Sequence, residues 1–157
     1  CIYNKFTAMC LKPKVKKMNG FVLFITGGWA AGITLAPFGI YIKEKYLTWT
    51  KIINHEKIHW QQQMEMIVAG AIIAAITVGI LLLLGISSWW LLTSLAFPFL
   101  FFYLWYLIEW LFKFILPPYD SAYSALSHER EANAFENDYE YLNNRKHFAW
   151  LKYLFHA

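Results

Sequence analysis

Residues 66–108 read MIVAGAIIAAITVGILLLLGISSWWLLTSLAFPFLFFYLWYLI, the longest stretch of the chain without a charged residue or a histidine. A membrane-spanning helix needs about 20 consecutive apolar residues, so this stretch is long enough for two spans and a tight turn. Gly85 and Ser87-Ser88 are turn formers, and Trp89-Trp90 are typical of a membrane–water interface. The sequence therefore predicts two transmembrane helices in a hairpin, with spans over 66–84 and 89–108 and the second helix extending to residue 116.

The composition of the whole chain is typical of a membrane protein. Of its 157 residues, 59% are hydrophobic, 20% are aromatic and only 15% are charged, whereas globular domains have about 25% charged residues. These values exclude a disordered chain, a coiled coil and a disulfide scaffold, and they argue against a freely soluble enzyme. A buried hairpin in a soluble protein is the alternative, but it would need far more chain to cover it.

Positive charges lie on both outer flanks of the predicted hairpin, and the loop between the spans has none. The positive-inside rule therefore places both termini, and the polar flanks with them, in the cytosol. Residues 1–19 contain five lysines and no acid, which predicts a solvated basic arm, with attachment to anionic lipid as an alternative. Cys1 implies either a missing upstream segment or the lipidated first residue of a cleaved lipoprotein, and the second option contradicts the charge pattern.

Residues 20–45 contain a second apolar stretch that is long enough to span. A third span would place the lysine-rich segments on its two sides in different compartments, and several glycines and Pro37 interrupt the stretch. Segments 21–26 and 32–43 are rich in β-branched and aromatic residues and flank Gly27-Gly28. We therefore expect a short β-hairpin or extended pair on the membrane face, with a third span as the alternative.

Residues 55–59, His-Glu-Lys-Ile-His, form an HExxH pattern. On a helix, two histidines at i and i+4 lie on the same face, where both can bind one Zn²⁺ ion. Glu56 can then serve as general base for a water that the metal activates. We expect one helix over 48–84 that continues into the first span, because Trp49 to Met66 contains no Pro or Gly. A pair of surface histidines is the alternative.

A catalytic zinc site needs a third protein ligand, and the acid-rich stretch on the same predicted side of the membrane is 127–135. It follows Pro117-Pro118 in a C-terminal helical segment predicted over 119–157. Helical geometry does not choose between Glu129 and Glu131, which face roughly opposite sides of a helix. Glu136 and Asp138 are expected to be solvated. Nothing in the sequence chooses among the candidates for stabilising an oxyanion, which are His128, Arg130, Tyr123 and Tyr119.

HExxH on one helix and Glu-x-x-Ala-Asp on a later one is the gluzincin arrangement of the CAAX prenyl endopeptidases and their bacterial heat-shock relatives, which are integral membrane zinc proteases. Residues 129–133, Glu-Arg-Glu-Ala-Asn, resemble that second motif. The resemblance implies a zinc site in the bacterial inner membrane, with Glu56 as base and three ligands, His55, His59 and Glu129. Asn133 stands where the family has an Asp that orients a ligand histidine. Asn lacks the negative charge of Asp but could still accept an imidazole N–H.

Two further segments, 54–62 and 129–132, resemble stretches of a group of small bacterial membrane proteins. Glu109, at the cytosolic end of the second span, needs a partner at that depth. Lys113 is the expected partner at i+4. The alternative is that Glu109 positions the site through Gln62 or Gln63.

The expected function is that of a membrane-embedded zinc endopeptidase that cleaves a peptide or membrane-protein substrate near the cytosolic face. Segment 32–43 could pair with the substrate as an added strand. The alternatives are a zinc-binding sensor or assembly protein with a closed metal shell, and a hydrolase of lipid amides. No nucleic-acid partner is expected, because the basic residues are mostly N-terminal and no binding motif accompanies them. The sequence does not predict the oligomeric state.

Overall fold

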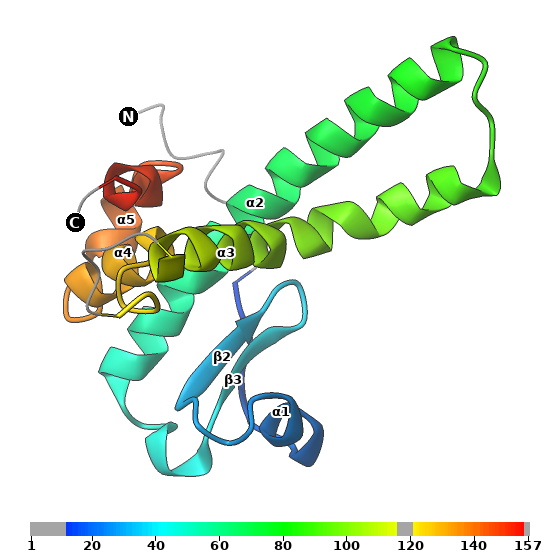
Figure 1. Ribbon diagram of the computed structural model, residues 1–157. Coiled ribbons are helices and arrows are strands. Elements are labelled where there is room, and N and C mark those ends of the chain that lie inside the picture. Colours follow the sequence, from blue (N-terminus) through cyan, green and yellow to red (C-terminus); the bar gives the residue numbers. More distant parts are fainter. Residues whose placement is uncertain (1–11, 116–120, 156–157) are drawn as a thin grey trace. The chain divides into compact units, whose positions relative to one another are not determined.

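A computed structural model describes residues 12–115 and 121–155, and the chain is mainly helical with one small sheet (Figure 1). The expectations for Cys1, Pro117-Pro118 and Tyr119 lie outside the described residues. The elements are β1 (Val15–Lys17), α1 (Gly20–Ile25), β2 (Gly32–Leu35), β3 (Gly39–Ile42), the 3₁₀ helix η2 (Glu44–Tyr46), α2 (Thr50–Leu83), the 3₁₀ helix η3 (Trp89–Ala96), α3 (Phe97–Ile115), α4 (Ser127–Phe135), α5 (Tyr141–Asn144) and the 3₁₀ helix η4 (Ala149–Tyr153).

The described chain divides into two compact units. Of the described residues, one unit contains 12–64 and 131–149, and the other contains 65–115, 121–130 and 150–155. Helices α2 and α4 each run unbroken from one unit into the other. The HExxH segment belongs to the first unit, and both predicted spans belong to the second.

The sheet of the first unit has the strand order β1-β3-β2, with β3 antiparallel to β2 and parallel to β1. Ile40 and Ile42 on the central strand are fully buried, as is Ile58 on α2. Burial of each of these side chains stabilises the fold by about 1.5–3 kcal/mol. A Cβ on Gly39, whose φ is +135°, would lie 2.7 Å from the Lys14 carbonyl oxygen, so the close approach of β1 requires glycine there.

The predicted hairpin is right in its second segment and wrong in its first. Both hairpin strands lie within 32–42, and segment 21–26, predicted to be extended, is mostly the helix α1. The Asn19 side chain accepts a hydrogen bond from the Val22 N–H at 2.9 Å, which is the geometry of a helix N-cap. This cap outweighs the β-branched and aromatic composition of the segment. The basic arm is also more ordered than expected, because residues 15–17 pair with β3.

Two helical segments, Thr50–Leu83 and Leu91–Ile115, are long and apolar enough to cross a membrane. The turn between them lies where the glycine and serines predict it. Gly85 has a φ of +74°, and the N–H groups of Gly85 and Ile86 donate to the carbonyls of Leu82 and Leu81. These two bonds form a Schellman motif, which ends a helix by satisfying its last carbonyls.

The second predicted span is not one continuous α-helix. Its first two turns are the 3₁₀ helix η3, and Pro98 is the second residue of α3. Proline is tolerated in the first turn of an α-helix, because its missing N–H would have no partner inside the helix there. Pro98 thus marks the change of helix type.

The core of the second unit joins α2 to α3. Met66, Phe102 and Trp150 form a buried cluster, against which Trp105 and Tyr106 also pack.

Gly70 lies at the contact of α2 with the start of α3. A Cβ on Gly70 would lie 2.9 Å from the Cα of Pro98, whereas one on Gly79 would meet no atom within 4 Å. We expect Gly70→Ala to lower the midpoint of thermal unfolding in detergent, because a backbone must shift. Gly79→Ala is the matched control and should preserve or raise that midpoint, since alanine favours a helix interior over glycine by about 1 kcal/mol. A Gly70→Ala protein as stable as the control would contradict this packing.

Candidate metal centre

His55 and His59 lie one turn apart on α2, and their rings pack edge to face. The ring centroids are 4.7 Å apart, and the two Nε2 atoms are 3.0 Å apart. Two nitrogens bound to one tetrahedral zinc ion at 2.0–2.1 Å would lie roughly 3.3 Å apart. The pair therefore needs only a small movement to share one metal ion.

The Nδ1 atom of each imidazole is held by a partner. Nδ1 of His55 lies 3.0 Å from a Glu136 carboxylate oxygen, and Nδ1 of His59 lies 2.8 Å from the Gln62 amide oxygen. Both oxygens accept hydrogen bonds, so both Nδ1 atoms donate, and in neutral rings both Nε2 atoms present a lone pair. Two such lone pairs at this distance repel each other, and a metal ion bound by both nitrogens would remove that repulsion. This arrangement fits a metal ion.

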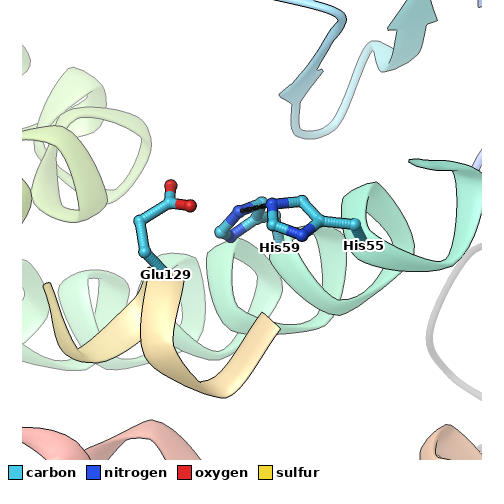
Figure 2. Close-up of side chains that lie close together, drawn as sticks. All are labelled: His55, His59 and Glu129. Atoms are coloured by element: carbon cyan, nitrogen blue, oxygen red, sulfur yellow. Dashed lines mark hydrogen bonds between the residues drawn. The ribbon is translucent and has the colours of Figure 1, made fainter. Parts of the chain in front are cut away.

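Glu129 supplies the third donor. One nitrogen from each histidine and one carboxylate oxygen of Glu129 all lie within 4.8 Å of one another. Figure 2 shows the three side chains pointing toward one another, the histidines from α2 and the glutamate from α4. This is the only such group of three among the residues that the structure describes.

The end of α4 is attached to α2 by Asn54, the residue before the HExxH segment. Its amide nitrogen lies 3.1 Å from the carbonyl oxygens of Phe135, Glu136 and Asp138. Phe135 is the last residue of α4, and Glu136 and Asp138 lie in the turn that follows it. Asn54 therefore binds the backbone at the C-terminal end of α4.

Glu131, the alternative third ligand, has other partners. It is fully buried and accepts hydrogen bonds from Arg145 Nε at 2.5 Å, from the Tyr141 hydroxyl at 2.8 Å and from Gln62 Nε2 at 3.1 Å. Because a carboxylate only accepts, the Gln62 NH₂ group faces Glu131 and its oxygen faces His59. Glu131 thus fixes the tautomer of His59 through Gln62, and it is not a member of the three-residue group.

Glu56 is buried beside β2, with 7% of its surface exposed. The Thr34 hydroxyl lies 2.8 Å from a Glu56 carboxylate oxygen and 2.9 Å from the Glu56 carbonyl oxygen. A Cβ on Gly32 would lie 2.7 Å from the other carboxylate oxygen. The carboxylate of Glu56, the predicted general base, therefore occupies space that is open because residue 32 of the edge strand has no side chain.

The carboxylate that contacts His55 belongs to Glu136, whereas the sequence predicted an orienting role for Asn133. Asn133 is exposed, while Glu136, expected to be solvated, bonds to His55 and forms an ion pair with Lys51 at 2.9 Å. Carboxylates that hold the second nitrogen of a metal-binding histidine are common, and they raise its basicity. Glu136 lies seven residues after Glu129, which is about two helical turns. This spacing is the feature of the sequence that could have pointed to Glu136.

The three oxyanion candidates within the described residues differ in their surroundings. His128 is fully buried and stacks on Trp150, with ring centroids 4.2 Å apart, whereas Arg130 is partly exposed. Tyr123 is 41% exposed, and its ring centroid lies 6.5 Å from that of Tyr106. The Tyr106 hydroxyl donates to Glu129 Oε1 at 3.2 Å. Nothing in the sequence marked Tyr106, which lies inside the second apolar segment.

Comparison with known proteins adds no relative. No family model, curated protein or solved structure matches the chain. The likeness to membrane gluzincins therefore rests on the two short motifs.

The contact between His55 and Glu136 yields a prediction. We expect Glu136→Gln to weaken zinc binding by about tenfold, because loss of a charged partner lowers the basicity of a ligand histidine. Zinc affinity can be measured by competition with a chromophoric chelator. Asp138→Asn removes a nearby exposed charge and should leave the affinity unchanged. Equal affinities for the two variants would show that Glu136 does not support the site.

Proposed function

We propose that the protein is a membrane-embedded, zinc-dependent endopeptidase. The observation that carries this proposal is the convergence of the His55 and His59 Nε2 atoms with the Glu129 carboxylate, next in sequence to the buried Glu56. Two imidazoles and one carboxylate are the ligand set of a well-known class of catalytic zinc sites. When bound, zinc would polarise a carbonyl and lower the pKa of a water toward 7.

Glu56 is suited to the role of general base. Its carboxylate follows the first histidine directly in the chain, and the Thr34 hydroxyl holds one of its oxygens at 2.8 Å. A positioned carboxylate can take a proton from the attacking water and return it to the leaving amine. The hydrogen bond from Thr34 limits rotation of the Glu56 side chain. Less conformational entropy is therefore lost when the carboxylate meets the attacking water.

The edge strand β2 can pair with an extended substrate along only part of the strand. The Gln63 side chain already donates to the Thr34 carbonyl and accepts from the Ala36 N–H, both at 2.8 Å. Added-strand recognition needs such backbone groups to be available. We therefore place the substrate segment at the Gly32 end of β2, beside Glu56, and not along the whole of 32–43.

Membrane embedding is proposed from the two helices that are apolar and long enough to cross and from the lysines on both flanks. In this proposal the HExxH part of α2 lies on the cytosolic side, and the substrate is a peptide or a membrane-protein segment near that face. A closed, non-catalytic metal shell would need a fourth protein ligand. Glu131, the candidate for it, is engaged by Arg145, Tyr141 and Gln62.

The proposal is tested with purified full-length protein and an unstructured reporter protein such as casein. We expect cleavage that a chelator abolishes and added zinc restores. Glu56→Gln should bind zinc like the wild type and cleave at least 100-fold more slowly, because general base catalysis contributes about 10²–10⁴-fold. Cleavage that persists in the chelator, or in the Glu56→Gln protein, would reject the assignment.

The space beside β2 yields a second test. A Cβ at residue 32 would approach the Glu56 carboxylate and its Cγ to within 2.7 and 2.9 Å, so Gly32→Ala must displace the base. We expect slower cleavage with unchanged zinc content. Gly20→Ala adds a Cβ that meets no atom within 4 Å and should cleave at the wild-type rate. A fully active Gly32→Ala protein would show that the position of Glu56 is not critical.

A further inference from the structure

Three polar residues follow one face of α3 near its end, within an otherwise apolar helix. Tyr106, Glu109 and Lys113 are spaced at i, i+3 and i+7, which places them on the same face. Glu109 and Lys113 are each only 6% exposed. A buried carboxylate and a buried ammonium group are costly unless they are paired and hydrogen-bonded, so their partners indicate what the face is for.

Glu109 and Lys113 hold the start of α4. They form an ion pair at 2.7 Å, and the two Glu109 oxygens accept hydrogen bonds from the Ser127 N–H and hydroxyl, both at 2.7 Å. Lys113 also donates to the carbonyl of Ala125. Ser127 is the first residue of α4, and the first N–H groups of a helix have no partner within it. The pair therefore fixes the backbone from which α4 starts.

Tyr106 lies one turn earlier on the same face and reaches the carboxylate that α4 presents. Its hydroxyl donates to Glu129 Oε1 at 3.2 Å, and Glu129 is two residues after Ser127. One face of α3 thus holds both the first turn of α4 and the proposed third ligand on that turn. A hydrogen bond to one carboxylate oxygen restricts the rotamer of the Glu129 side chain.

We propose that Tyr106 is a positioning residue for the metal site, which holds Glu129 toward the two histidines while the Glu109–Lys113 pair fixes the start of α4. This inference rests on the proposed metal site and not on peptide cleavage. It also assigns a function to the polar face of a predicted membrane span, since that face determines where the third ligand lies.

The test removes the hydroxyl and keeps the ring. Tyr106 packs against the cluster of Met66, Phe102 and Trp150, and Tyr106→Phe preserves that packing. Tyr103→Phe is the matched control, because it removes a phenol from the same helix at a site that is 41% exposed. Full-length proteins in detergent are compared by zinc competition, by the visible spectrum of the Co²⁺-loaded form, and by thermal unfolding without metal.

We expect Tyr106→Phe to weaken zinc binding by about tenfold, in line with other residues that orient metal ligands, and to change the Co²⁺ spectrum. The unfolding midpoint without metal should match that of Tyr103→Phe, which should keep wild-type affinity and spectrum. Tyr106→Phe with wild-type affinity and spectrum would overturn the inference. A wild-type protein that binds no zinc would overturn it together with the proposed function, whereas zinc binding without any cleavage would overturn the peptidase proposal alone.

Discussion

The arrangement of the first unit depends on the need of buried polar groups on α2 to find partners. A buried polar group without one costs about 1–3 kcal/mol, and the HExxH part of α2 carries a run of them. Thr34 on β2 bonds to Glu56, and the end of α4 bonds to Asn54. These partners come from both sides of the long apolar segment in the sequence. Satisfying one helix face therefore places both the sheet and α4 against it.

The same constraint explains why the motif residues around the histidines are polar. Asn54 binds the turn that ends α4, Gln62 links His59 to Glu131, and Gln63 bonds to the backbone of β2. Each of these side chains can be required for the structure of the site without contacting a substrate. A stretch that looks like an extended catalytic motif is in large part a set of structural contacts that keep two imidazoles in one orientation.

The long features of this fold could be predicted from the sequence, and the short ones could not. The helix through His55 and the turn at Gly85 follow from periodicity, apolar length and turn chemistry, which are local properties. Helix α1 was missed because one hydrogen bond to Asn19 outweighs the composition of its six residues. The seven-residue spacing places Glu136 on the same side as Glu129, but the spacing alone does not predict the contact of Glu136 with His55, which depends on tertiary packing.

The choice between Glu129 and Glu131 shows how a residue distant in the sequence can determine which carboxylate is able to bind a metal. Both carboxylates lie on α4, two residues apart, and both are buried. Arg145, whose side chain is 2% exposed, forms an ion pair with Glu131. Turning Glu131 toward a metal would leave that guanidinium buried without its partner, and breaking a buried pair costs about 3–5 kcal/mol. Glu129 accepts a hydrogen bond from the Tyr106 hydroxyl and lies in the group with His55 and His59, so it is the carboxylate placed to serve as a ligand.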